Sequence, residues 1–318
     1  MTNGSNRGSA MVRRLVSAAA LALVLAAPLP ALAVTQATMN RFVGAPSETF
    51  ADADQAVAAL KLRLAAQDVP GLAKLLGLNA DELAKTEDFD ARLGKLKNAA
   101  QQRVYVEDEG EDRKVVNLGD LVYPFPFPLV KKDGQWSFDT KAGIQEVVDR
   151  RIGENELNAI KVCRDYIAAQ KVYASKDRDG DNVLEYAQKL ISTPGKQDGL
   201  YWHAEPGEDE SPAGPFVNAE KIDKGKVGDG YYGYHFRILT KQGDNVAGGA
   251  YDYVINGNMI AGFALIAWPV RWGETGIMTF ACSHAGVVYE RNLGPNTAEI
   301  VKRIKRFNPL PSWAVTRD

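Results

Sequence analysis

The chain has 318 residues, of which 45% are hydrophobic and 25% are charged, and this is an ordinary globular composition. Its formal net charge of −2 and its pI near 6.0 argue against bulk binding of nucleic acid, because proteins that neutralise phosphates are usually basic. Beyond the N-terminal segment, no apolar run approaches the ~20 residues that a membrane-spanning helix needs. A multispanning membrane protein is therefore excluded as well.

The first 33 residues have the pattern of a secretory signal peptide. Arg13 and Arg14 precede the apolar segment "LVSAAALALVLAAPLPALA", which closes with small residues at the site of cleavage. The apolar run reaches only about a dozen residues before Pro28, which favours a cleaved signal over the alternative of a retained anchor. We therefore predict cleavage after Ala33 and a periplasmic or secreted location.

The remaining length of roughly 285 residues is typical of two domains. We assign residues 34–49 to a linker and residues 50–140 to an N-terminal α+β domain. Residues 141–313 are assigned to a C-terminal domain, built from a long helix and an antiparallel sheet. The fold class predicted for the whole chain is α+β.

Residues 50–76 are expected to form two helices. Asp52 with Gln55 three residues later is a variant of the capping box, and apolar residues then recur at helical spacing. The sequence "QDVPG" breaks this pattern, and Gly77 ends the second helix as a C-terminal glycine. A third helical segment is expected within residues 79–101.

Strand patterns follow this helical region. The segment "FPLVKKDGQWSFD" predicts a hairpin, because its Asp133-Gly134 pair accepts the positive backbone angles of a tight turn. The prolines of "YPFPFP" at 123–128 donate no ladder hydrogen bond, so that this segment fits an edge strand or an extended connector. Helices followed by such a meander resemble the cone-shaped α+β fold of the NTF2-like superfamily.

The C-terminal half begins with a helical pattern over residues 141–175, which Gly153 is expected to interrupt. Residues 192–230 are rich in Gly, Pro, Asp and Glu and predict a long irregular excursion. Five strand patterns with short, turn-forming connections come next, which predicts an antiparallel meander. A last helix is expected over residues 297–307, with Asn296 as its N-cap.

The stretch "KDRDGDNVLEY" carries carboxylates at alternate positions, where a calcium loop has its oxygen ligands. The candidate metal ligands, at the first, third, fifth, seventh and ninth positions, are Asp177, Asp179, Asp181, Val183 through its carbonyl, and Glu185. Asn182 stands where an EF-hand has glycine, and Gln188 replaces the bidentate glutamate at position twelve. Two alternatives remain open: a weak calcium site, or a solvated acidic turn that caps a following helix.

The two cysteines are expected in the protein core. Cys163 lies on the apolar stripe of the predicted helix, and Cys282 lies in the strand pattern "IMTFACS". An exported protein can form a disulfide, whereas buried free thiols behave as small hydrophobic residues. The sequence leaves both alternatives open.

Histidines and aromatic residues give no defined catalytic pattern. His203, His235 and His284 are far apart and lack the i, i+4 spacing of a zinc pair, so that structural or surface roles are expected. The tyrosines of "YYGYHFRI" and "AYDYV" either fill sheet packing or offer a surface for a glycan or a peptide. The excursion over residues 192–230, which we expect to carry function, would cover that sheet.

Several longer motifs carry a resemblance to a known family. The segments "VKKDGQWSFDTKAG", "YASKDRDGDNVLEYAQ", "GGAYDYVINGNMIAGFALIAWPV" and "FNPLPSW" resemble an uncharacterised bacterial family, domain of unknown function 2950, over roughly residues 45–313. This resemblance implies an exported envelope protein and supplies no catalytic residue.

The C-terminal half also resembles the globular heads of type IV pilins and type II secretion pseudopilins. The shared features are a helix beginning "NELNAIKVCRDYIAAQKVYAS", a loop, and a strand meander that ends near "GVVYE". A folded region precedes the helix here and the hydrophobic half-helix of a pilin is missing, so that assembly into a pilus is not expected.

Taken together, these patterns predict a non-enzymatic binding or assembly module of the bacterial cell envelope, stabilised by calcium if the acidic loop binds it. The expected partner is an envelope protein or a glycan. The alternative is a hydrolase that acts on a cell-wall or envelope substrate, for which the sequence identifies no acid or base carboxylate.

Overall fold

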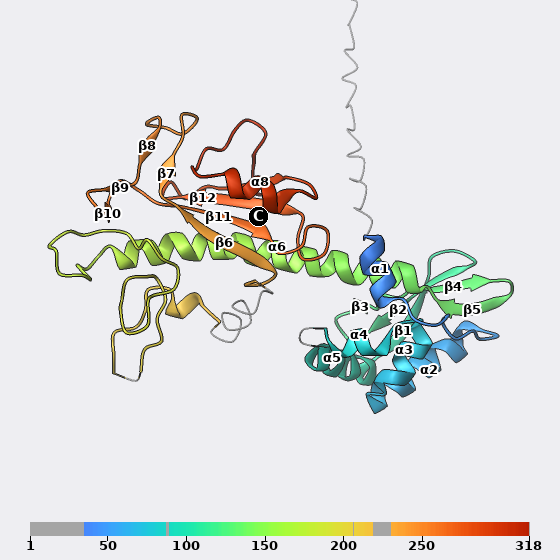
Figure 1. Ribbon diagram of the computed structural model, residues 1–318. Helices are drawn as coiled ribbons and strands as arrows, with labels where there is room; N and C mark the ends of the chain where they lie inside the picture. The colour runs from blue at the N-terminus through green and yellow to red at the C-terminus, as the bar shows by residue number, and fades with distance from the viewer. Residues whose placement is uncertain (1–34, 87–88, 206, 219–229, 318) are drawn as a thin grey trace, which may run out of the picture. The chain divides into compact units, whose positions relative to one another are not determined.

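The computed structural model describes residues 35–86, 89–205, 207–218 and 230–317 (Figure 1). The predicted signal peptide therefore lies outside the described residues. Helices and antiparallel sheets are grouped around two separate apolar cores, so that the protein belongs to the α+β class, as predicted. Among the described residues, no helix combines the length and the apolar character needed to span a membrane.

Five helices open the described chain. They are α1 (Gln36–Phe42), α2 (Ala53–Ala66), α3 (Val69–Leu76), α4 (Ala80–Ala84) and α5 (Phe89–Gln102). The predicted cap of α2 is confirmed, since the Asp52 carboxylate accepts the backbone N–H of Gln55 at 2.8 Å. Gly77 ends α3 in the left-handed conformation at φ +68°, also as predicted. The segment expected to be a linker carries α1, whose Thr35 cap accepts the N–H of Thr38 at 3.2 Å.

The first sheet is antiparallel and packs with these helices around the N-terminal core. Its strands are β1 (Val104–Asp108), β2 (Arg113–Leu118), β3 (Tyr123–Pro124), β4 (Leu129–Lys132) and β5 (Gln135–Phe138), in the order β1-β2-β4-β5 with β3 beside β2. The β4–β5 hairpin turns at Asp133 and Gly134, with φ of +52° and +79°, as the sequence predicts. The proline-rich segment supplies the short strand β3 and the buried rings of Phe125 and Phe127.

Helix α6 (Thr140–Tyr173) is continuous over 34 residues and contributes to both cores (Figure 1). Its first half places Ile144 and Ile152 in the N-terminal core, and its second half places Cys163 and Tyr166 in the C-terminal core. The predicted interruption at Gly153 was wrong. A helical glycine costs only about 1 kcal/mol relative to alanine, and each large apolar side chain buried on either side contributes about 1.5–3 kcal/mol.

The second sheet is a five-stranded antiparallel meander in the order β14-β13-β12-β11-β6, as the pattern of short connections predicts. The elements of this half are η1 (Gly214–Phe216), β6 (Tyr234–Leu239), β7 (Lys241–Gln242), β8 (Tyr251–Asp252), β9 (Val254–Ile255), β10 (Asn258–Met259), β11 (Ala264–Pro269), β12 (Met278–Ser283), β13 (Val288–Asn292), α8 (Thr297–Arg303) and β14 (Ala314–Val315). The hairpins β7–β8 and β9–β10 lie between β6 and β11 in the chain.

Alternation along the strands gives this sheet two different faces. Phe236, Leu265 and Cys282 point to the face that packs on α6, and the intervening residues Ile266 and Ala281 point to the other face. Figure 1 shows α6 running along the sheet with α8 near the same strands. Each face is therefore buried by a different helix and carries its own cavity.

Helix α8 begins at Thr297 as predicted, but its side-chain cap and its C-terminal end differ from the prediction. Asn296 makes no side-chain capping bond, because its backbone is not extended, and Thr297 instead donates its hydroxyl to the carbonyl of Gly294 at 2.6 Å. The helix stops at Arg303, four residues earlier than expected. At that end Arg237 donates to the carbonyls of Val301 and Ile304, at 2.8 and 2.6 Å, which satisfies the terminal acceptors.

Candidate functional site

The acidic loop follows α6 directly and brings three of the five predicted ligands together. Ligand oxygens of Asp177, Asp179 and Asp181 lie within 4.8 Å of one another, and all three side chains are exposed. The Asp177 carboxylate accepts the backbone N–H groups of Gly180 and Asn182 at 2.8 and 2.9 Å. These backbone bonds lower the pKa of Asp177, so that the group stays anionic at neutral pH.

Glu185 is placed differently from the other carboxylates of the loop. Its Oε2 accepts the backbone N–H of Met259 in β10 at 3.0 Å, and it is not part of the group of three. Burial raises the pKa of the Glu185 carboxyl. Asp181 accepts from the Asn258 amide at 2.6 Å, so that two side chains tie the loop to the β9–β10 hairpin.

The backbone of the loop bears on both alternatives. Asn182, at the position of the EF-hand glycine, is left-handed at φ +66°. Residues 182–190 contain no helix, so that the expectation of a helix capped by the loop was wrong. The backbone N–H groups that the three aspartates accept belong to the loop itself. Calcium binding, with Val183 and Glu185 as further ligands, remains a prediction.

Calcium is expected to raise the thermal unfolding midpoint of the purified protein. At about 5 mM calcium and a dissociation constant of about 0.5 mM, mass action adds about 1.4 kcal/mol, or roughly 3–5 °C. Asp179→Ala should remove this rise, and Asp244→Ala, in an exposed loop elsewhere, should retain it. Equal midpoints in calcium and in chelator would leave the loop as a polar turn.

The histidines take structural or surface positions in the described chain. His235 is half-buried in β6 against the ring of Trp268, and burial lowers its pKa. His284 packs against the rings of Tyr253 and Phe263. His203 is exposed and lies 3.5 Å from the Glu205 carboxylate.

The two cysteines lie in the C-terminal core, where helix α6 packs on strand β12. Cys163 on α6 and Cys282 on β12 are both fully buried and free, and the Cys282 sulfur lies 3.6 Å from the Cys163 carbonyl oxygen. Burial raises the pKa of the Cys282 thiol well above its ordinary value, which keeps it protonated and unreactive. The expectation that both residues face one core is confirmed.

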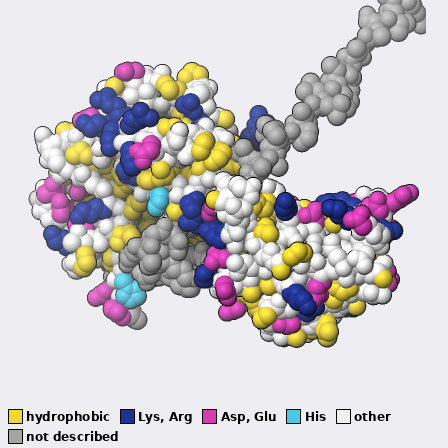
Figure 2. All heavy atoms as spheres, turned by 45° about the vertical axis from the view of Figure 1, so that its right-hand side comes forward, with side chains coloured by type: hydrophobic (Ala, Val, Ile, Leu, Met, Phe, Trp, Pro, Cys, Tyr) yellow, Lys and Arg dark blue, Asp and Glu magenta, His cyan; other side chains and the backbone are white. Residues whose placement is uncertain are grey.

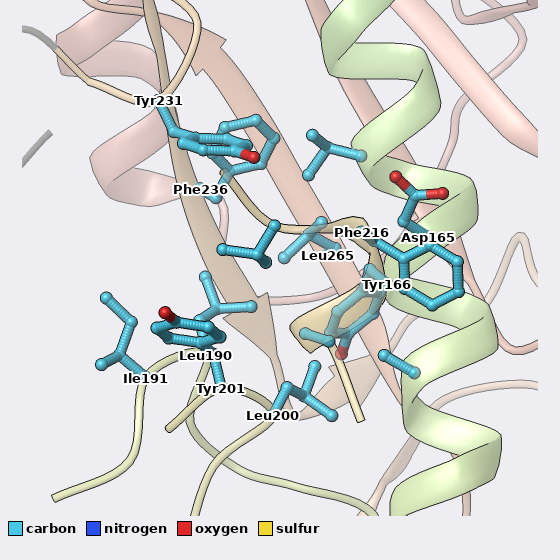
Figure 3. Close-up of a pocket in the computed structure, with 14 residues that line it drawn as sticks. Asp165, Tyr166, Leu190, Ile191, Leu200, Tyr201, Phe216, Tyr231, Phe236 and Leu265 are labelled. Atoms are coloured by element: carbon cyan, nitrogen blue, oxygen red, sulfur yellow. The ribbon is translucent and has the colours of Figure 1, made fainter. Parts of the chain in front are cut away.

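An apolar pocket lies between α6, the β6–β11 edge of the second sheet and the excursion (Figure 3). Its volume is about 140 Å³. One helix face supplies Val162, Asp165, Tyr166 and Ala169, which recur at the spacing of a single stripe. The remaining lining comes from the sheet, from the excursion and from residues directly before and after it, namely Leu190, Ile191, Leu200, Tyr201, Ala213, Phe216, Val217, Tyr231, Phe236 and Leu265.

The polar groups at this pocket are largely occupied within the protein. Asp165 pairs with Lys161 one helical turn away, with an Oδ2–Nζ distance of 2.6 Å. The Tyr166 hydroxyl donates to the Ala264 carbonyl at 3.2 Å, and burial raises the pKa of this phenol well above its ordinary value. The Tyr231 oxygen accepts the backbone N–H of Asn218 at 3.1 Å. A ligand would therefore meet mainly apolar surface.

Two apolar side chains remain exposed at the pocket, one directly before the excursion and one within it. Ile191 is 45% exposed and Phe216 is 39% exposed, although both line it. Figure 3 shows Phe216 beside Asp165, with Ile191 at the other end of the pocket near Tyr201. These two side chains extend the apolar surface that a ligand at this pocket would contact.

Residues 47–316 match the profile of a family described as a protein of unknown function, DUF2950. The chain belongs to this family. No curated protein and no solved structure matches it. The NTF2-like and pilin-like resemblances of this DUF2950 protein therefore remain predictions, although its α+β class is established by the described elements.

Sequence reasoning missed most of the apolar pocket of this DUF2950 protein. It expected the excursion to cover an aromatic sheet, and Tyr201 and Tyr231 do line the pocket. It did not identify Ala169 or Leu190, whose roles depend on contacts between distant segments. The only available signal was the helical stripe that contains Tyr166, because its spacing continues past the core positions.

Proposed function

We propose that this protein is an exported binding module of the bacterial envelope, in which the apolar pocket between α6 and the excursion receives an apolar side chain of a partner protein. The observation that carries this proposal is the apolar lining of the pocket, together with the exposed Ile191 and Phe216 at its border. Export to the periplasm is proposed from the N-terminal pattern of residues 1–33.

The size of the pocket limits what it can accept. Its volume of about 140 Å³ is close to that of apolar protein cavities that bind one benzene ring. A single aromatic or branched aliphatic side chain fits this space, and a whole folded domain or an extended lipid does not. The rest of a partner would contact the surrounding surface, where Ile191 and Phe216 are exposed.

The chemistry of the lining favours a protein partner over a glycan. A sugar brings several hydroxyl groups, and each of them loses hydrogen bonds to water when it enters an apolar site without a partner. Asp165 is the one carboxylate among the lining residues, and Lys161 already neutralises it. The hydrolase alternative needs two carboxylates with different roles, so that no observation at this pocket favours it.

The proposal is tested with N-acetyl-L-phenylalanine amide, which presents one aromatic side chain on a peptide unit. Burial of a ring of 150–250 Å² at about 25 cal/mol/Å², less the cost of ordering, is compatible with a dissociation constant of about 1 mM. Saturation-transfer NMR on the purified protein measures this binding. N-acetylglycine amide and the disaccharide chitobiose should give no specific signal.

Ala169→Leu should weaken binding of the aromatic probe at least about tenfold, because the added atoms occupy the space of the ring. Its matched control is Ala168→Leu, at the neighbouring helix position, which does not line the pocket. Phe216→Ser, at a partly exposed position, provides a second variant that leaves the core intact. Binding of chitobiose instead of the aromatic probe, or unchanged binding in both pocket variants, would overturn the proposal.

A further inference from the structure

A second cavity lies on the other face of the sheet, under α8 and the segment that follows it. Its volume is about 430 Å³, which is within the range of small-molecule sites. The floor is formed by Leu239, Ile266 and Ala281, which the strand register places on one face. These three residues are buried, so that the cavity reaches the apolar interior of the sheet.

The wall of this cavity is the C-terminal segment. Leu310 and Trp313 line it as apolar groups, and Leu310 is 44% exposed. The segment is fixed to the rest of the half by backbone bonds, since Phe307 donates its N–H to the Lys241 carbonyl at 2.8 Å and accepts from the N–H of Gly243 at 3.0 Å. These two bonds hold the wall against strand β7 and the residue that follows it.

Four cationic side chains also line the cavity: Arg291, Arg303, Lys305 and Arg306. No carboxylate is among its lining residues, and no ion pair joins these four to an acid within the described part of the chain. The neighbouring Lys302 does not line the cavity and pairs with Glu299 at 2.6 Å. On the face shown in Figure 2, Lys and Arg side chains lie among both apolar and acidic side chains.

An apolar floor beside an unneutralised cationic border is complementary to a molecule that has both an apolar part and an anionic group. Like charges at close range repel one another, and an anion placed among them removes this repulsion. Arginine binds carboxylates and phosphates through two parallel hydrogen bonds, and the apolar floor gains free energy only from a ligand with an apolar part.

We propose that the cavity under α8 binds an anionic amphiphile, that is, a single acyl or alkyl chain that ends in a carboxylate or a phosphate. The head lies among Arg291, Arg303, Lys305 and Arg306, and the chain lies along Leu239, Ile266 and Trp313. This site is separate from the pocket on α6, because the two cavities share no lining residue and lie on opposite faces of the sheet.

The test is isothermal titration of the purified protein with octyl phosphate at concentrations where it is monomeric. We expect one site per chain, with affinity at least about tenfold tighter than for inorganic phosphate or 1-octanol. Inorganic phosphate lacks the apolar chain, and 1-octanol lacks the anionic group. The double variant R303Q/R306Q should lose at least about tenfold in affinity, and Leu310→Ser should weaken octyl phosphate without affecting inorganic phosphate. Lys302→Gln, which removes a charge outside the cavity, is the matched control and should change affinity by less than about twofold.

Three outcomes would overturn the proposal. Inorganic phosphate that binds as tightly as octyl phosphate would show an anion site without a role for the apolar floor. Equal losses in R303Q/R306Q and Lys302→Gln would show general attraction to a basic surface. Binding to vesicles of phosphatidylglycerol, with no binding of monomeric octyl phosphate, would show that this face contacts a membrane and does not hold a single amphiphile.

Discussion

Gly143→Ala is expected to destabilise the protein by about 2 kcal/mol, although alanine is the better helix former. A Cβ atom at this position would lie 1.9 Å from Cδ1 and 2.4 Å from Cγ of Phe127. Cγ is close to the backbone, so that a small rotation of the ring cannot relieve the overlap, and Phe127 is buried between two prolines. Overpacking costs about 1–3 kcal/mol, and the overlap with Cγ places this cost at the upper end, so that about 2 kcal/mol remains after the helical gain of about 1 kcal/mol is subtracted.

The same helix offers a matched control at Gly153. A Cβ atom there meets no atom within 4 Å, and the residue is exposed. Gly153→Ala should therefore stabilise the protein by up to about 1 kcal/mol. Urea unfolding of the two variants measures both effects. A Gly143→Ala variant as stable as Gly153→Ala would show that α6 and the proline-rich segment do not pack as described.

The difference between these two glycines also shows which features of the fold the sequence predicts. Gly153 was expected to interrupt the helix, because a glycine in an isolated helical pattern is destabilising. The continuous helix is stabilised by contacts on either side of this position, from Ile144 and Ile152 in one core and from Ile160 and Tyr166 in the other. Such tertiary contacts are invisible to a local pattern.

Features determined by neighbouring residues were predicted well. The cap of α2 at Asp52, the end of α3 at Gly77 and the hairpin turn at Asp133-Gly134 depend on bonds or backbone angles within a few residues. Asn296 occupies the predicted N-cap position, but its side chain makes no capping bond, because its backbone is not extended in the turn that follows Gly294.

The acidic loop is formed mainly by residues close together in the sequence, whereas the apolar pocket is formed by distant segments. Asp177, Asp179 and Asp181 come together because they alternate within one turn of chain, and the sequence identified them directly. Glu185 is not part of this group of three, since its carboxylate accepts the N–H of Met259, more than seventy residues away, and its role as a calcium ligand remains a prediction. The pocket depends on such distant contacts throughout, since the stripe on α6 becomes part of a cavity only when the excursion returns to it.

One buried side chain binds the segment that leads into the excursion to α6. Gln170 is fully buried, and its amide nitrogen donates to the Ala187 carbonyl at 2.8 Å and to the Tyr166 hydroxyl at 3.0 Å. Its amide oxygen accepts the backbone N–H of Ala187 at 2.8 Å. Both polar groups of the Ala187 backbone are thus satisfied by this one residue, three positions before Leu190, the first residue after α6 that lines the pocket.

Gln170→Ala is expected to cost about 3–5 kcal/mol, because it leaves a buried N–H and a buried carbonyl without partners and also opens a cavity. The matched control is Gln188→Ala, which removes the same atoms from an exposed side chain and should cost less than about 1 kcal/mol. Urea unfolding compares the two, and limited proteolysis should show faster cleavage within residues 190–217 of the Gln170 variant. Equal losses of stability in both variants would mean that Gln170 does not hold the excursion, and the pocket would then need another anchor on α6.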